Sequence, residues 1–554
     1  MPTSTLATAC VAALVALGLL NPFAYGPSTA GYPQLLGLLV ACLLMLQAAL
    51  SHAPLRASAA WRWLAALAGW VVLQSLVVQP SMTFVVVVVA ALGVGLLLQW
   101  RPAGEGAEGL AWGLAFAAGI NALIGWLQFF DLADALHPWL NVPVQPGVVF
   151  GNLRQPNQFA SALCMGLAGV WWLCRTQKLT YRLAVAAVAL LVSGVVISGS
   201  RTGVLELVLL GAAAWLWRGT VPRRVALLFV ALPALYLLEW GLIRAVAQLA
   251  SLVMTSGLER FGSTAGPSRL TLWQNVLVLI AHKPWLGYGV HELGYAHFMF
   301  DFSHSGYKGR HMELIDNAHN IVLQSWVELG VFGMLLTVVP FAVGTLRARP
   351  WAEALASRQA SWLVLGVLVL HSMLEYPLYY AQFWLPFCLA MAVVFAPPQR
   401  AHVAPSIQGT GATRTAMTAS GVLLVGFFIY AAWDYDRVSQ AYGGPQRRAP
   451  ESGVNPVLEA QKSYLFRPYA RFALTTTAQI DAKNAMQWLY LLEQGLRFSA
   501  EPRTIEPLIE ALQFTGDTEG AARYLARYRA AFPQDYAQFI ATHPAGGASA
   551  MPAQ

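Results

Sequence analysis

The chain alternates between long apolar runs and short polar connections over most of its length. Each run is long enough to cross the hydrocarbon core of a bilayer, about 30 Å thick, as a helix. Such runs lie near residues 5–21, 33–50, 63–79, 82–99, 110–130, 158–174, 181–198, 203–217, 224–243, 318–346, 360–375, 377–396 and 415–433. The pattern predicts an all-α fold, a polytopic membrane helical bundle with about 12–13 transmembrane helices.

Two long polar segments depart from this pattern. Residues 244–317 form a loop with one predicted helix, Ser268–His282, which the following sequence KPWLGYG ends. From about residue 434 onward, apolar residues recur at helical spacing in a polar background. We therefore expect a transmembrane domain over 1–433, with 244–317 as its large loop, and a soluble helical domain over 434–545. The small residues of 546–554 predict a disordered tail.

The soluble part contains a segment with the length of a known repeat. Residues 500–533 have the 34-residue period of a tetratricopeptide (TPR) helix pair, with Gly516-Asp517 at the turn and Pro533 at the end. Small residues open the second helix of this pair. The pattern predicts a TPR-like helical domain, which would serve for docking or packing.

Composition and charge support a membrane protein and set its orientation. Hydrophobic residues make up 57% and charged residues 11% of the chain, whereas soluble domains carry about a quarter charged residues. The net charge of +8 comes from basic residues in short loops between apolar runs, so it does not indicate a nucleic-acid partner. Placing the N-terminus in the cytoplasm puts nearly all these loops inside. The sequence therefore predicts a multi-pass protein of the bacterial inner membrane, with 131–157, 198–202, 244–317 and the C-terminal domain in the periplasm.

The five cysteines offer no metal or disulfide chemistry. All lie inside or at the ends of apolar runs, and the sequence has no CxxC motif or Cys/His cluster. Neither a disulfide framework nor a zinc site is predicted.

One histidine stands where the large loop enters a membrane helix. The sequence there is DNAHN, and at helical spacing Asp316, His319 and Asn320 share one face. An imidazole accepts a proton near neutral pH, and a nearby carboxylate fixes its tautomer. A lone interfacial histidine is usually structural, but three other polar clusters are predicted on the same side. We therefore take His319 as a candidate base and Asp316 as its orienting group.

Two of these clusters carry amides and guanidinium groups. GNLRQPNQ places Arg154, Gln155 and Asn157 at the start of a membrane helix, either as a helix cap or as a polar wall for a sugar or phosphate. Arg201, in SGSRTG, either snorkels at the interface or joins neighbouring N–H groups in holding an anion. Arg269 has the same predicted outer placement. Two arginines converging on a diphosphate would stabilise it as a leaving group.

The third cluster is the turn HSMLEYPLYY between two membrane helices. Glu375 is costly at this depth unless it is paired or hydrated. Tyr376 and Tyr379 belong either to an aromatic belt at the interface or to the lining of a polar cavity.

In this order, GNLRQPNQ, SGSRTG, KPWLGYG, DNAHNIVLQSWVELG and HSMLEYPLYY resemble a known family over roughly residues 110–400. It is that of the PglL-type bacterial protein O-oligosaccharyltransferases, in the superfamily that includes O-antigen ligases and O-antigen polymerases. The turn HSMLEYPL followed by a helical tail is similar to the protein-glycosylating branch.

The resemblance implies transfer of a preassembled glycan from an undecaprenyl-diphosphate carrier to a Ser/Thr hydroxyl of a periplasmic, pilin-like protein. It implies no metal and no other cofactor. The family's essential histidine corresponds to His319, its glutamine to Gln155 and its tyrosine to Tyr379 or Tyr376. Its phosphate-binding arginines correspond to Arg201 and Arg269.

Three alternatives remain open. The first is an O-antigen ligase that moves the glycan onto lipid A core. The second is a non-enzymatic transporter of lipid-linked glycans, which predicts inverted repeats that the sequence does not display. The third is a membrane scaffold that uses its helical tail for docking.

Overall fold

A computed structural model describes residues 2–51, 55–102, 106–254, 257, 265–306, 309–312, 314–396, 410–443 and 455–543. The predicted disordered tail, 546–554, lies outside the described residues. Each apolar run corresponds to one helix, or in one case to two. These are α1 (Pro2–Leu20), α2 (Gly31–Leu50), α3 (Ala60–Val78), α4 (Met82–Leu97), α5 (Ala107–Phe129), α6 (Pro156–Arg175), α7 (Tyr181–Ile197), α8 (Arg201–Leu216), α9 (Arg223–Val230), α10 (Leu232–Leu249), α14 (Ile321–Ala348), α15 (Ala356–Ser372), α16 (Ala381–Val394) and α17 (Gly411–Ser439).

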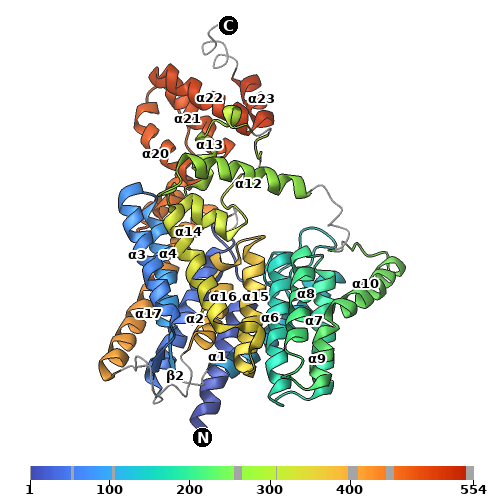
Figure 1. Ribbon diagram of the computed structural model, residues 1–554. Helices are drawn as coiled ribbons and strands as arrows, with labels where there is room; N and C mark the ends of the chain where they lie inside the picture. Colours follow the sequence, from blue (N-terminus) through green and yellow to red (C-terminus); the bar gives the residue numbers. More distant parts are fainter. Residues whose placement is uncertain are drawn as a thin grey trace.

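These helices run side by side as one bundle (Figure 1). Among the described residues, β1 (Leu55–Ala57) and β2 (Trp100–Pro102) form a single antiparallel pair. Five described helices are both long and apolar enough to span a membrane, and the α9–α10 pair would add a sixth. The prediction of an all-α membrane helical bundle is confirmed, and the chain is a multi-pass membrane protein.

The predicted single span at 224–243 is in fact two helices, α9 and α10, bent by 51° relative to each other. Pro233 stands at the second position of α10. Proline has no N–H to continue the hydrogen-bond ladder of the preceding helix, so the break falls next to it.

Helix α6 lies in the middle of the bundle and is buried along most of its length. It packs against α5 closely because a Cβ on Gly166 would collide with Ala118, and one on Gly169 with the carbonyl of Ala111. Small residues at such crossings allow membrane helices to approach each other. The second half of α6 is therefore packed tightly against α5.

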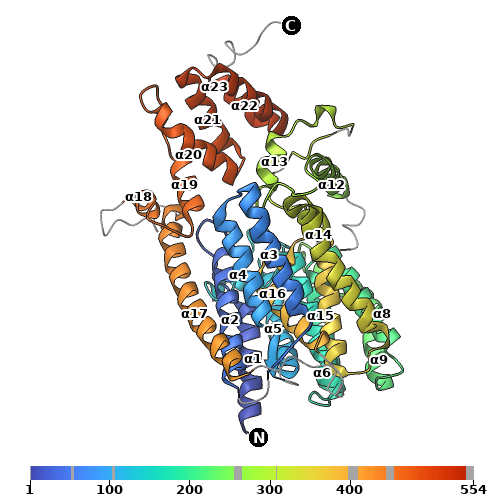
Figure 2. The ribbon, with the colours of Figure 1, turned by 60° about the vertical axis from the view of Figure 1, so that its left-hand side comes forward.

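The helices outside the bundle form a second layer at one end of it (Figure 2). The large loop provides α12 (Ala265–His282), which is the helix predicted at Ser268–His282, and α13 (Leu293–Met299). The C-terminal part provides α18 (Pro456–Ala460), α19 (Arg467–Thr475), α20 (Ala485–Phe498), α21 (Pro502–Thr515), α22 (Thr518–Ala531) and α23 (Pro533–Thr542).

The C-terminal helices and the large loop share a core. Phe298 of α13 is buried together with Leu492, Ile505 and Tyr528 of α20–α22. Arg497 on α20 also pairs with Glu292 of the loop at 2.8 Å. The two segments are therefore docked on each other. Gly516, with φ of 81°, ends α21. That this region is a TPR-like domain stays a prediction.

Helix α14 is interrupted in its middle. Gly330 has φ 69° and ψ −176°, so the helical hydrogen bonds stop there. The turn 284–289 takes their place, because the N–H groups of Tyr288 and Gly289 donate to the carbonyls of Val327 and Glu328, each at 2.9 Å. The first part of α14 is thereby fastened to the large loop.

Candidate functional site

The segment before α14 holds His319 in a defined, non-helical conformation. Helix α14 begins at Ile321 with Asn320 as its N-cap, and His319 has φ of 50°, in the left-handed region. The Asn317 side chain accepts from the His319 N–H at 2.8 Å, and the Trp273 indole donates to the Ala318 carbonyl at 2.9 Å. The prediction that Asp316, His319 and Asn320 share a helical face is therefore wrong, because two asparagine side chains capture this backbone before the helix starts.

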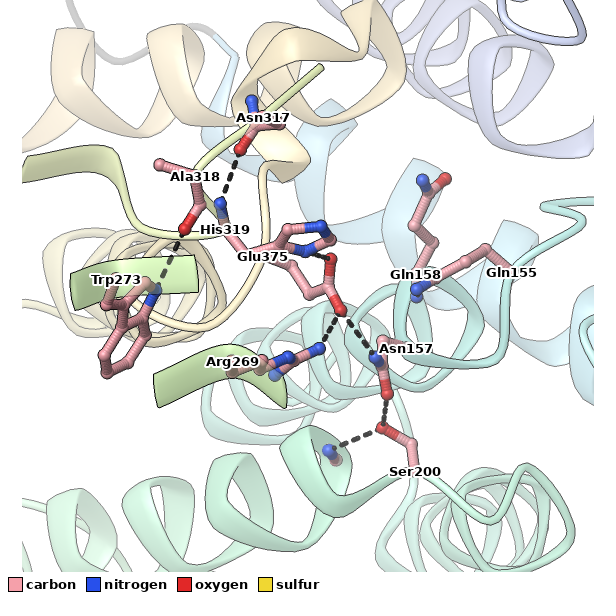
Figure 3. A network of polar contacts seen from close by, with 11 residues as sticks. Gln155, Asn157, Gln158, Ser200, Arg269, Trp273, Asn317, Ala318, His319 and Glu375 are labelled. Atoms are coloured by element: carbon pink, nitrogen blue, oxygen red, sulfur yellow. Dashed lines mark hydrogen bonds and ion pairs between the residues drawn. The ribbon is translucent and has the colours of Figure 1, made fainter. Parts of the chain in front are cut away.

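Glu375 is the centre of the polar network around His319 (Figure 3). One carboxylate oxygen lies 2.6 Å from His319 Nδ1. The other accepts from the guanidinium of Arg269 and from Asn157 Nδ2, the latter at 3.4 Å. The loop before α14, the start of α6, helix α12 and the turn after α15 thus meet at one carboxylate, which is only 8% exposed.

The electrostatics of Glu375 fix the state of the imidazole. Burial alone would raise the pKa of Glu375, but the hydrogen bond and charge of His319, and then the charge of Arg269, outweigh it and lower the pKa. The carboxylate is therefore ionised at neutral pH and can only accept hydrogen bonds. In neutral His319 the proton must then lie on Nδ1, which leaves the lone pair of Nε2 for a substrate proton.

The orienting carboxylate is Glu375, and the predicted partner Asp316 makes none of the hydrogen bonds described for the His319 ring. Asp316 is exposed and lines a cleft. Because His319 lies in the left-handed region, the spacing of a regular helix does not apply here, which explains why the sequence spacing was misleading. The ring edge of His319 instead contacts Tyr376, with centroids 5.1 Å apart.

The network continues from Asn157 to the start of α8. Ser200 donates to Asn157 Oδ1 at 2.7 Å and caps α8 by accepting from the Gly203 N–H at 3.0 Å. Arg201 is the first residue of α8, directly after this cap. The structure therefore brings the beginning of α8, where an anion is favoured, close to the Glu375 network.

Four predicted site residues have other partners. The guanidinium of Arg154 donates to the Pro22 carbonyl, and burial lowers its pKa to about 10. Gln155 caps α6, because its side chain accepts from the Gln158 N–H at 2.6 Å. Asn320, besides capping α14, donates to the Met373 carbonyl at 3.1 Å. Tyr379 directs its hydroxyl to Glu328, 3.5 Å away. These contacts hold the helix ends around the site in place.

A second buried cluster, which no sequence motif predicted, lies about one turn deeper in the bundle. Ser161 on α6 donates to Glu206 on α8 at 2.5 Å and lies 2.7 Å from His371 Nδ1 on α15. The three helices that it joins carry Asn157, Ser200 and Glu375 at their ends. The sequence signal for this cluster was Glu206, an isolated glutamate inside the apolar run of α8.

The arrangement suits proton abstraction next to an anionic leaving group. A guanidinium has five N–H donors, so Arg269 can bind Glu375 and an anion at the same time. Among the described residues, no three His, Cys, Asp or Glu side chains are placed to hold a metal ion.

The residues of the site fall in two regions of the chain that match different family descriptions. Residues 159–338 match the family described as O-antigen ligase. Residues 359–545 match the C-terminal region of virulence factor membrane-bound polymerases. The first region contains Arg201, Arg269 and His319, and the second contains Glu375 and Tyr376. The hydrogen bond between His319 and Glu375 therefore joins the two matched regions.

Two curated proteins of Acinetobacter baylyi are similar to this chain. The general O-oligosaccharyltransferase is 31% identical over 285 residues, which are 48% of this chain and 49% of that protein. The ComP-specific O-oligosaccharyltransferase is 24% identical over 282 residues, which are 49% and 47%. The chain thus spans about half the length of the curated relatives that it matches.

Proposed function

We propose that this chain, which belongs to the O-antigen ligase superfamily and is of the PglL type, is an oligosaccharyltransferase. Its donor is a preassembled glycan on an undecaprenyl-diphosphate carrier, and its acceptor is a Ser/Thr hydroxyl of a pilin-like protein. The matched families and the two oligosaccharyltransferase relatives support this assignment.

In the proposed reaction His319 is the general base. Its Nε2 takes the proton of the acceptor hydroxyl as that oxygen forms a bond to the anomeric carbon. The bond between this carbon and the phosphate oxygen breaks, and its electron pair leaves with the diphosphate. Arg269 and Arg201 stabilise the charge that develops there. Glu375 holds the Nδ1 proton and stabilises the imidazolium.

We place the site at the periplasmic side of the bacterial inner membrane, with the N-terminus in the cytoplasm. The basic residues in the short loops at the opposite end of the bundle support this orientation. In it, the C-terminal helices and the large loop also lie in the periplasm.

The observation that carries the proposal is the ion-paired Glu375 between His319 and Arg269. The test is glycan transfer by the purified chain, given a lipid-linked oligosaccharide and a pilin-like protein. His319→Ala should lower the rate by about 10²–10⁴-fold, the usual contribution of a general base, without loss of thermal stability. A variant with near wild-type turnover would refute the role of His319.

The match to the O-antigen ligase family makes lipid A core the second candidate acceptor. The same assay, with core lipid in place of the protein, separates the two. Transfer to core lipid alone would overturn the assignment of a protein acceptor. Movement of the lipid-linked glycan across a vesicle membrane, without transfer to either acceptor, would indicate a transporter.

A further inference from the structure

A cleft of about 930 Å³ ends at Asp316 and Asn317, in the segment before α14. Its floor is formed by α2, α4 and α17 of the bundle, and its roof by α19 and α20. These elements surround the same region in Figure 2. None of the groups assigned to the glycan-lipid above lines it among the described residues, so the cleft has no function in the reaction as proposed so far.

The inner end of the cleft reaches the segment that holds His319. Asn317, which binds the His319 N–H, and Tyr376, which touches the ring edge, both line it. In Figure 3, Asn317 lies on one side of His319, and Arg269 and Ser200 lie on the other. A displacement at the anomeric carbon that inverts it requires the nucleophile and the leaving group on opposite faces. With the diphosphate at Arg269, the hydroxyl must arrive from the side of the cleft.

The walls of the cleft differ in polarity from floor to roof. The floor is apolar, with Leu38, Val87 and Phe428 from three helices of the bundle. The roof carries Arg467 and Arg471, whose guanidinium groups lie over the rings of Tyr464 and Tyr490, at 5.7 and 5.8 Å from the centroids. A ligand of the whole cleft must therefore be apolar at one end and polar at the other.

The charges are also separated along the cleft. Among the described residues, no carboxylate lies within ion-pair distance of Arg467 or Arg471, whereas Arg497 is paired with Glu292 at 2.8 Å. Three carboxyl groups line the cleft. Glu292 is the partner of Arg497, and Asp316 and Glu328 lie at the inner end, where Glu328 accepts from the His291 N–H at 2.8 Å. The roof is thus basic, which favours an acidic partner there.

We propose that this cleft binds the acceptor, a membrane-anchored polypeptide with an acidic segment next to its anchor. The apolar anchor lies against α2, α4 and α17, and the acidic segment contacts Arg467 and Arg471. This brings a Ser/Thr hydroxyl to His319 opposite the diphosphate. The inference rests on the proposed function. A polypeptide fits better than a second lipid, because Ser81, Thr83 and Gln494 in the polar wall can satisfy main-chain groups, which a lipid tail lacks.

Binding without donor tests the cleft independently of catalysis. The full chain in phosphatidylcholine nanodiscs is titrated with two fluorescent peptides, each an apolar membrane span followed by a polar segment with one serine. The polar segment is acidic in one peptide and has lysines at the same positions in the other. Wild type should bind the acidic peptide more tightly. The double variant Arg467→Glu/Arg471→Glu should weaken that binding by about tenfold or more and reverse the preference.

Arg523→Glu on α22 is the matched control, since Arg523 also lies over a tyrosine ring, at 5.5 Å, but outside the cleft. It should leave both affinities unchanged. Equal affinities for both peptides, or no effect of the double variant, would overturn the proposal. With polyprenyl lipid added to the nanodiscs, a photoreactive group at Tyr464 that crosslinks this lipid instead of the peptide would also overturn it.

A failure of this proposal can be distinguished from a failure of the proposed function. His319→Ala should lower the rate of transfer by about 10²–10⁴-fold while peptide binding stays at the wild-type level. Transfer to core lipid with none to serine would overturn the protein acceptor, whatever the peptides do.

Discussion

Replacing Glu375 by glutamine tests the central contact of the site. The carboxylate accepts from His319, Arg269 and Asn157 at once. Glutamine has nearly the same size but only one acceptor oxygen, and its NH₂ group must face either the Nδ1 proton or the guanidinium. One donor then meets another, so the imidazole loses its fixed tautomer or Arg269 loses its position.

The magnitude follows from the bonds that are lost. Each charge-assisted hydrogen bond contributes about 1.5–3 kcal/mol, and glutamine loses one of them, either the one to His319 or the one to Arg269. At 1.36 kcal/mol per tenfold change in rate, Glu375→Gln should lower kcat by about 10–10²-fold.

The assay is turnover with saturating donor and acceptor, and Glu353→Gln is the matched control. Glu353 pairs with Arg358 at 3.2 Å, outside the network of Glu375, so its amide variant should keep kcat within about threefold of wild type. Equal losses in the two variants, or wild-type turnover of Glu375→Gln, would refute the assignment of Glu375.

The pH dependence of stability gives a second readout. Because the pKa of Glu375 is lowered in the folded protein, its contribution to stability is complete above the ordinary glutamate pKa, about 4.3. It is lost as the pH falls through the lowered value. The difference in Tm between wild type and Glu375→Gln should therefore be constant from pH 7 to 5 and shrink below about pH 4.

Three further predictions concern stability. Gly330→Ala should destabilise the fold by at least about 2–3 kcal/mol in thermal unfolding, because its Cβ would collide with the Trp285 carbonyl at a positive φ; a wild-type Tm would contradict this. Arg154→Ala should lower the free energy of unfolding by about 1.5–3 kcal/mol, because the hydrogen bond to the Pro22 carbonyl is lost, while kcat per folded molecule stays unchanged. A loss of turnover without a loss of stability would instead show that Arg154 contacts the substrate. Burial lowers the pKa of His291 to about 4, so between pH 6.5 and 4 this side chain is protonated in the unfolded chain and neutral in the folded one. The free energy of unfolding should therefore fall by about 1.4 kcal/mol for each unit by which the pH is lowered from 6.5 to 4. His291→Phe should remove this dependence.

The sequence predicted the bundle well because apolar length decides membrane helices almost alone. Helix α7 (Tyr181–Ile197) was expected at 181–198, and α2 (Gly31–Leu50) at 33–50. It also predicted that the motifs with Asn157, His319 and Glu375 belong to one end of the bundle, since alternating spans return there. This second prediction requires only the order of the membrane spans along the chain.

Side-chain geometry was beyond such reasoning. Glu375 is 56 residues from His319 and nevertheless binds it, whereas Asp316, three residues away, does not. His319 has a left-handed backbone conformation, and its N–H donates to the Asn317 side chain, so the spacing of a regular helix does not relate it to Asp316. The cleft beneath α19 was equally hidden, because it forms only when the C-terminal helices dock on the large loop.

The break at Gly330 lets one turn hold both halves of α14. On the side of His319, the carbonyls of Val327 and Glu328 accept from the turn 284–289, and beyond the break the Val331 N–H donates to the Pro284 carbonyl at 2.9 Å. We therefore expect a shift of the second half to be passed through this turn to the segment that carries His319.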